Sequence, residues 1–238
     1  MERRPLGMGE LLSGLALAVD APPARGGAVE AVRSPPVMMF LVNPLETLSL
    51  ALGAGFSSGL NLYATVATLG LLERFAVIHL PASLQALAHP WVIGIAAVLY
   101  LFEFFADKIP YIDTLWDFVH TFIRPPAAAL LAYAAVSGAG AEWRWGAALL
   151  AGGVALTSHG AKATARAAVN TSPEPFSNWT LSLGEDALAV WLSWMASAHP
   201  VATTIVVFLL LTLCAYLIYR LFRFARRPVR RMLDAYFR

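Results

Sequence analysis

The chain has 238 residues, of which 58% are hydrophobic and only 13% are charged, with a formal net charge of +2. A soluble domain has about 25% charged residues, so this composition favours an integral membrane protein with several helical spans. The small net charge gives no reason to expect nucleic-acid binding. The single cysteine, Cys214, excludes a disulfide or a thiolate metal cluster within one chain.

Residues 1–40 differ from the rest of the chain and are rich in Pro, Gly, Ala and Arg. Their longest apolar stretch, LLSGLALAV, is too short to span a bilayer, which needs about 20 apolar residues. Arg3 and Arg4 before this stretch resemble the start of a signal peptide, but Glu10 adjoins the apolar part and two prolines follow it. We therefore predict a disordered or surface-lying extension over residues 1–40.

The hydrophobic pattern predicts an all-α fold, a polytopic membrane helical bundle of about six transmembrane helices over residues 43–222. The first span begins with Asn43 as N-cap, Pro44 at the first helical position and Glu46 at the third. It runs through Asn61 to about Leu72. The other spans run over about 91–105, 126–137, 145–168, 186–196 and 201–221.

Basic residues set the predicted orientation, because cytoplasmic flanks carry an excess of Lys and Arg. Arginine is frequent after the sixth span, so we predict a basic cytoplasmic tail over 223–238. Counting back through six spans puts the connections 106–125 and 170–184 inside and leaves only Arg74 and Arg144 outside. A multi-pass protein with both termini in the cytoplasm is therefore expected. Two prolines make the second connection a predicted structured loop or re-entrant turn. Within it, Ser182 and Glu185 are predicted to form a capping box for the fifth span.

The fourth span contains four polar side chains within an apolar run: Ser158, His159, Lys162 and Arg166. The spacing of Ser158, Lys162 and Arg166 places them on one helix face, with His159 one residue round. Charges that face lipid are costly, so we expect these groups to face the protein interior or a wet cavity. Snorkelling of Arg166 to the interface is the alternative.

The first span carries Ser58 and Asn61 at a similar depth, and its segment GFSSGLNLYAT can be laid over GVALTSHGAKATAR of the fourth span. Glycine-broken polar segments at matching places in two inverted halves indicate a transporter site near the bilayer midplane. We therefore predict a weak inverted repeat in which the two helices run in opposite directions. The small residues could instead serve only close helix packing.

The stretch between the second and third spans, ADKIPYIDTLWDFVHTFIRP, predicts an amphipathic interfacial helix over 112–124. One stripe is apolar, and the opposite stripe holds Asp113, Asp117, His120 and Arg124. Three interpretations stay open. Asp113, Asp117 and His120 could bind a metal ion; the stripe could face solvent; or it could line an inner polar vestibule, which we favour.

Glu103 and Asp107 share a helix face at the inner end of the second span, next to Lys108. We assign no catalytic residue, metal ligand or cofactor. The candidate substrate-binding residues are Ser58, Asn61, Glu103, Asp107, Lys108, Asp113, Asp117, His120, Arg124, His159, Lys162 and Arg166.

Three blocks, GLNLYATV, ADKIPYIDTLWDFVHTFIRP and SHGAKATARAAVNTSPEPFSNW, resemble those of a bacterial integral-membrane family catalogued as domain of unknown function 4126. The resemblance covers roughly residues 44–200. It implies a compact multi-span helical protein of the bacterial inner membrane and carries no activity.

The polar residues at matched depth lead us to expect a small transporter or flippase-like permease whose vestibule takes an anionic or zwitterionic substrate. Membrane lipid and a small-molecule or lipid substrate are the expected partners, and a homo-oligomer is compatible with the sequence. The alternatives are an intramembrane enzyme acting on lipid-linked phosphate and a structural membrane assembly factor.

Overall fold

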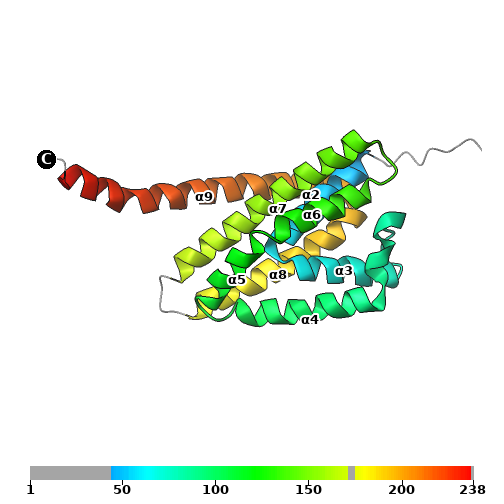
Figure 1. Cartoon of the computed structure of the whole chain (residues 1–238), viewed down its shortest axis with the longest axis horizontal. Coiled ribbons are helices and arrows are strands. Elements are labelled where there is room, and N and C mark those ends of the chain that lie inside the picture. The colour runs from blue at the N-terminus through cyan, green and yellow to red at the C-terminus, as the bar shows by residue number, and fades with distance from the viewer. Residues whose placement is uncertain (1–43, 171–174, 237–238) are drawn as a thin grey trace, which may run out of the picture. The chain divides into compact units, whose positions relative to one another are not determined.

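The computed structural model describes residues 44–170 and 175–236, with side chains placed for 45–170 and 176–223. Every regular element in these ranges is a helix, which confirms the all-α prediction (Figure 1). All of them belong to the unit Leu41–Arg238. The predicted extension over 1–40, the Asn43 cap and the side chains of the basic tail lie outside the described residues.

The helices follow one another with short connections. In chain order they are α2 (Pro44–Leu60), α3 (Leu62–Arg74), the 3-10 helix η1 (Ala82–Ala88), α4 (Pro90–Ala106), α5 (Ile112–His120), α6 (Arg124–Ala135), α7 (Ala141–Val169), α8 (Pro175–Ala198) and α9 (Pro200–Tyr236).

The predicted first span is wrong, because the chain reverses in its middle. Asn61 has extended backbone angles (φ −151°, ψ 103°) and its side chain accepts a hydrogen bond from the Ala64 amide, which starts α3 as a new helix. Leu69 of α3 then packs in one apolar cluster with Leu50 and Ala54 of α2. Helices α2 and α3 therefore form a helical hairpin whose tip is at Asn61.

The predicted capping box at Ser182 and Glu185 is also wrong. Helix α8 already begins at Pro175, a residue favoured in the first helical turn, so both side chains lie within the helix. The expected loop over 170–184 is therefore helical from Pro175 onward, and residues 171–174 lie outside the described ranges. This longer helix adds Asn178 and Glu185 to the buried polar residues of the bundle.

Helices α2 and α7 run in the same direction, contrary to the predicted inverted repeat. Gly55 lies against Ala151, and Gly59 lies against Ala155 and Ser158, so the contacts advance together along both helices. A Cβ atom at Gly59 would overlap the Ala155 carbonyl oxygen. The absence of side chains at these glycines is what permits the close approach.

Helices α2 and α9 also begin on the same side of the bundle (Figure 1). Gly53 lies against Thr203 near the start of α9, and Leu60 shares an apolar cluster with Cys214 further along it. The start of α2 and the end of α9 are therefore at opposite ends of the bundle. This arrangement gives no support to the predicted placement of both ends on one side of a membrane, because the hairpin at Asn61 adds one reversal of the chain.

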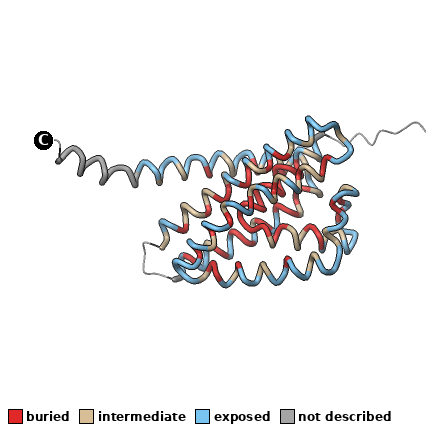
Figure 2. Tube along the Cα trace, viewed as in Figure 1, coloured by how far each residue is buried: buried red, intermediate tan, exposed pale blue. Residues whose placement is uncertain are grey.

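Apolar side chains cover much of the outer surface. Figure 2 shows that many residues of α4 and α9 are exposed. On α4, Trp91 is 76% exposed and Phe105 is 62% exposed. In the described part of the chain, only α9, over Pro200–Arg223, is long and apolar enough to cross a membrane alone, and η1 with α4, bent by 64°, would be a second span. Core helices of soluble proteins can have the same length and apolar composition, so this finding is weak evidence of membrane association.

Candidate functional site

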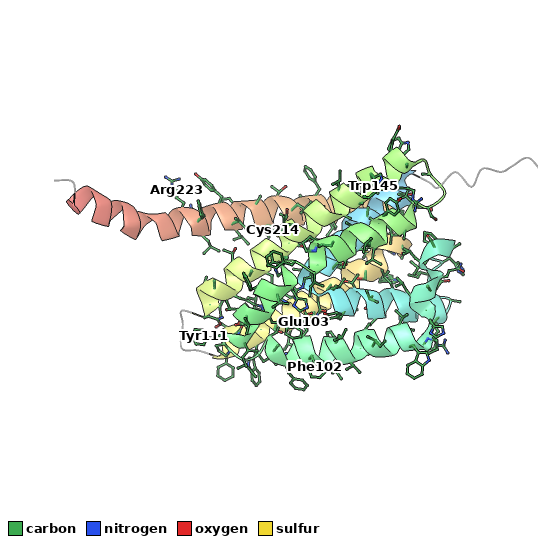
Figure 3. All side chains as sticks on the ribbon, in the orientation of Figure 1. Phe102, Glu103, Tyr111, Trp145, Cys214 and Arg223 are labelled. Carbon is green, nitrogen blue, oxygen red and sulfur yellow. The ribbon has the colours of Figure 1, made fainter. Side chains whose placement is uncertain are left out.

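Eight charged side chains come together inside the bundle, and we call them the buried ion cluster. Each has a side-chain exposure of 8% or less. They come from α4 and its C-cap, α5, α6, α7 and α8, and are Glu103, Asp107, Asp113, Asp117, Arg124, Lys162, Arg166 and Glu185. Figure 3 shows Glu103 directed into the bundle, whereas the adjacent Phe102 points outward.

Helix α5 turns its polar stripe inward. Its apolar residues Leu115 and Phe118 are each 65% exposed, whereas Asp113, Asp117 and His120 are buried. The solvent-facing interpretation of this stripe is therefore wrong. The predicted helix over 112–124 ends at His120, and Arg124 instead starts α6.

Arg124 joins three elements through its guanidinium. Nη2 donates to Glu103 Oε1 at 2.7 Å, and Nη1 donates to the Gly59 carbonyl at 3.0 Å and to His159 Nδ1 at 2.8 Å. An Arg–carboxylate bond of this length is strong. Arg124 thereby ties the start of α6 to α4, α7 and the end of α2.

Lys162 and Arg166, one turn apart on α7, share the carboxylate of Asp107. Lys162 Nζ and Arg166 Nη2 each lie 2.8 Å from Asp107 Oδ2. Arg166 Nη2 is also 2.7 Å from Glu185 Oε2, and Lys162 Nζ is 3.4 Å from Glu103 Oε1. The predicted sharing of one face by Lys162 and Arg166 holds, and that face meets carboxylates rather than open water.

The tip of the α2–α3 hairpin lies against the buried ion cluster. The last carbonyls of α2 accept hydrogen bonds from side chains instead of from its own helix: Gly59 from Arg124 and Leu60 from Lys162. The negative end of a helix favours cations, and both cations lie there. At the start of α3, Asn61 donates to Asp186 Oδ1 at 2.8 Å.

The two buried histidines have fixed partners. His159 Nδ1 faces Arg124, which can only donate, so Nδ1 accepts and Nε2 donates to the Asp117 carbonyl at 3.0 Å. His120 Nδ1 donates to the Trp116 carbonyl at 2.8 Å, so Nε2 accepts from the Tyr63 hydroxyl at 3.1 Å. His159 is therefore neutral, and burial lowers the pKa of His120, which favours its neutral form.

Asp113 and Asp117, one turn apart on α5, differ in their hydrogen bonds. The Asp113 carboxylate accepts from Asn170 at 2.9 Å and 3.0 Å and from the Thr114 amide at 2.6 Å. Both carboxylate oxygens of Asp117 are buried without a hydrogen-bond partner. Burial raises the pKa of Asp117 from its usual 3.8 to about 6, against the opposing attraction of Lys162 and Arg124.

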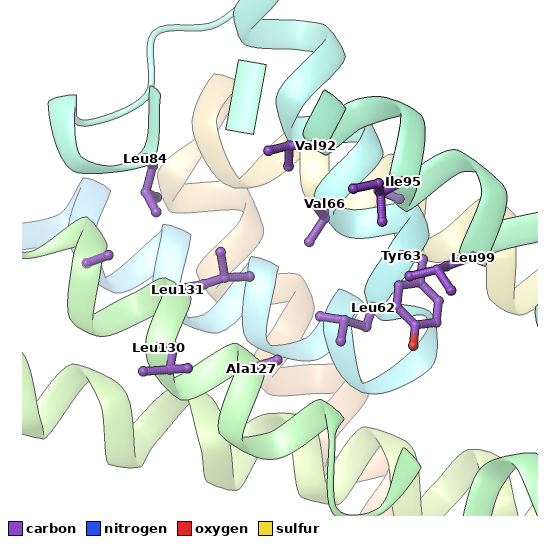
Figure 4. A pocket seen from close by; sticks show the side chains of 12 residues that line it. Leu62, Tyr63, Val66, Leu84, Val92, Ile95, Leu99, Ala127, Leu130 and Leu131 are labelled. Atoms are coloured by element: carbon purple, nitrogen blue, oxygen red, sulfur yellow. The ribbon is translucent and has the colours of Figure 1, made fainter. Parts of the chain in front are cut away.

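An apolar hollow of about 450 Å³ lies between α3, η1, α4 and α6 (Figure 4). Tyr63 lines it, and the hydroxyl that contacts His120 is its polar edge. The hollow has the volume of a small-molecule site. Its other lining residues are Leu62, Val66, Leu84, Val92, Ile95, Ala96, Leu99, Ala127, Leu130, Leu131 and Ala134.

Most of the candidate residues lie in or beside the buried ion cluster, and two lie apart from it. Lys108 donates to the Phe104 carbonyl and lies over the Phe104 ring, 3.0 Å from its centroid. Ser58 is buried, and its hydroxyl has no hydrogen-bond partner. The site residues that the sequence interpretation left out are Tyr63, Tyr100, Thr121, Asn170, Asn178, Glu185 and Asp186. Those on α8 were missed because a loop, rather than a helix, was expected over 170–184.

Within the described ranges, no group of three His, Cys, Asp or Glu side chains is placed as metal ligands would be. The metal interpretation of Asp113, Asp117 and His120 therefore has no support from this geometry. His120 is turned toward Tyr63, and Asp113 toward Asn170.

A family model described as Domain of unknown function (DUF4126) matches residues 48–220, which include the hairpin and the whole buried ion cluster. No curated protein and no solved structure matches the chain.

Proposed function

The chain belongs to the DUF4126 family, and from that premise we propose that it is a small multi-pass membrane transporter, a flippase-like permease for an amphipathic substrate with a zwitterionic head. The observation that carries the proposal is the α2–α3 hairpin, whose tip meets the buried ion cluster. Broken helices whose ends meet at a polar site are typical of secondary transporters.

The distribution of polarity supports a membrane location. The exposed faces of α4 and α5 are apolar, while the described charges of α5, α6 and α8 are inside. Charges within a bilayer face the protein interior and mark substrate or proton paths. Helices α7 and α8 carry such charges, which lower the mean hydropathy of both helices.

The charge pairing favours a zwitterionic head over a purely anionic one. All three cations of the buried ion cluster already bind carboxylates of the chain, and the cluster holds five carboxylates for these three cations. An added anion would have to displace a carboxylate and leave it unpaired, which is costly in a buried site. The anionic group of a zwitterion can pair with a cation of the cluster while its cationic group pairs with the displaced carboxylate, so the net charge of the site stays the same.

The apolar hollow supports an amphipathic substrate. An apolar tail in the hollow would bring its polar end to Tyr63 and His120, which adjoin the cluster. Burying apolar surface contributes about 25 cal/mol per Å², so a tail supplies binding energy that a small polar solute lacks.

Lipid movement across proteoliposomes tests the proposal. The probe is phosphatidylethanolamine labelled on its acyl chain with a fluorophore that an external reductant bleaches, compared with phosphatidylglycerol carrying the same label. We expect the wild-type chain to move the zwitterionic probe faster than protein-free vesicles do, and Lys162→Met to lose most of this activity. Arg220→Met, on the exposed face of α9, is the matched control and should keep it. No movement above protein-free vesicles contradicts the proposal.

The saturated pairing of the cations also favours a second candidate, a membrane assembly factor whose buried charges only lock helices together. It predicts that Lys162→Met lowers thermal stability, while no lipid probe moves in either protein. Measuring melting and flux on the same preparations separates the two functions.

A further inference from the structure

We propose that the side chain of Asp117 is a proton-binding site within the buried ion cluster, and that its proton is the coupling ion of the site. The binding of a proton stands on the geometry of this side chain, whereas its role as a coupling ion rests on the proposed transport function.

Asp117 is the carboxylate that the cluster leaves unsatisfied. It is 2% exposed, and neither oxygen has a hydrogen-bond partner. Its nearest cationic atoms are Arg124 Nη1 at 3.5 Å and Arg166 Nε at 3.9 Å, both too long for hydrogen bonds. A buried carboxylate without donors is costly, and a proton removes that cost.

The neighbouring cations are held by other groups. Arg124 is directed at Glu103, and Arg166 is directed at Asp107 and Glu185. The other charged or titratable groups around Asp117 are Lys162 and His159 of α7, Asp107 after α4, and Asp113 and His120 on its own helix. The cluster has an excess of two carboxylates, so one of them can take a proton without leaving a cation unpaired.

The two histidines are poorer proton acceptors than Asp117. His159 presents its acceptor nitrogen to Arg124, whose guanidinium keeps its protons. His120 Nε2 is occupied by the Tyr63 hydroxyl, and burial, with Arg124 nearby, lowers the pKa of His120. Burial shifts the pKa of Asp117 upward, the opposite direction to its effect on His120.

Loss of the proton gives the site a second arrangement. The Nε atoms of Arg124 and Arg166 are buried and lack hydrogen-bond partners, as the Asp117 oxygens do. An ionised Asp117 is attracted to both arginines, so deprotonation draws α5 toward α6 and α7. The proton thus controls the contact between α5 and the two helices that carry the cations.

Infrared difference spectroscopy on the full chain in lipid nanodiscs tests the inference, because a protonated carboxyl has its own carbonyl band. Between about pH 4 and about pH 8, we expect a band that disappears with a midpoint near pH 6 in the wild type. Asp117→Asn should lack this band. Glu142→Gln, which removes an exposed carboxylate at the start of α7 outside the cluster, is the control and should keep the band with its midpoint unchanged.

Asp117→Glu covers the case in which Asp117→Asn does not fold. Its longer side chain should keep a titrating band but move the midpoint. A band that survives in Asp117→Asn, or a midpoint that is unchanged in Asp117→Glu, overturns the inference. A midpoint that falls as sodium replaces potassium also overturns it, because a metal cation then competes for the site. A normal titration together with absent lipid flux would keep the proton site and reject the transport function.

Discussion

Helix α7 passes through two regions that differ in chemistry. In its first half, Ala151 and Ala155 pack against glycines of α2, and small apolar side chains fill the space. In its second half, Lys162 and Arg166 meet carboxylates of α5, α8 and the C-terminal end of α4. The same helix therefore supports a close-packed apolar region and, two turns later, the buried ion cluster.

The two regions contribute to stability in different ways. Small residues in direct contact gain dispersion energy and need no polar partner. Buried ion pairs roughly break even against apolar residues of the same volume, because removing charges from water is costly. A requirement for folding alone would be met by the first kind of packing, so the charges in the second half of α7 indicate a function.

The largest expected effect comes from removing one partner in the buried ion cluster. Arg124→Ala leaves Glu103 with only the longer contact to Lys162, at 3.4 Å, and we expect it to lower the free energy of unfolding by about 3–5 kcal/mol. Unfolding in detergent micelles measures this. Arg220→Ala, on an exposed face, should change it by less than about 0.5 kcal/mol. Equal effects of the two substitutions would mean that the buried ion pairs contribute no more to stability than an exposed charge does.

The next effect tests the apolar region. Gly59→Ala places a methyl group against the Ala155 carbonyl and the Ser158 hydroxyl, so we expect a loss of about 2–3 kcal/mol. Gly153→Ala, also within a helix but with open space around it, is the control and should stabilise the protein by up to about 1 kcal/mol. A mild effect at Gly59 would mean that α2 and α7 pack less closely than described.

An effect that depends on pH is expected at Asp117. The pKa is 3.8 in its usual state and about 6 in the folded protein. The folded state thus binds more protons between these values, and this contribution to stability falls as the pH rises through that window. Asp117→Asn removes it. We expect the variant to gain about 3 kcal/mol over the wild type at neutral pH and less than about 1 kcal/mol at about pH 4.

Melting curves of both proteins at several pH values check this difference. Paired carboxylates elsewhere in the cluster affect both proteins equally, so they cancel in the comparison. A difference that does not depend on pH, or one that grows toward acid pH, would contradict the assignment.

The smallest effect concerns the edge of the apolar hollow. Tyr63→Phe removes the hydroxyl that donates to His120, and we expect a loss of about 1 kcal/mol. Tyr219→Phe, at an exposed position, should have no measurable effect. If Tyr63→Phe also behaves as neutral in the same melting assay, the hydroxyl does not link the hollow to the buried ion cluster.

The composition and the helical periodicity predicted the all-α fold, and the cost of buried charge predicted that Lys162 and Arg166 face inward. The helical spacing placed Asp113 and Asp117 on one polar stripe. It could not decide whether this stripe is buried or exposed, because amphipathic spacing is the same in both cases. Lys108, in the same charged stretch, lies outside the network because its flexible side chain reaches Phe104.

The hairpin at Asn61 could not be predicted from hydropathy. A single residue with extended backbone angles reverses the chain, and apolar side chains continue on both sides of it. Asn is a common N-cap, so the asparagine within GLNLYAT was the available signal. The role of Glu185 was missed for a related reason: Ser182 and Glu185 match a capping box, while the helix had already started at Pro175.

The most direct test of the account measures lipid flux under a pH gradient. In proteoliposomes carrying acyl-labelled phosphatidylethanolamine, the wild-type chain is predicted to move the probe, and a transmembrane pH gradient is predicted to accelerate it. Asp117→Asn, which should melt at an equal or higher temperature at neutral pH, is predicted to lose the response to the gradient. An Asp117→Asn protein that keeps the full response would contradict the account, as would a wild-type protein that moves no probe.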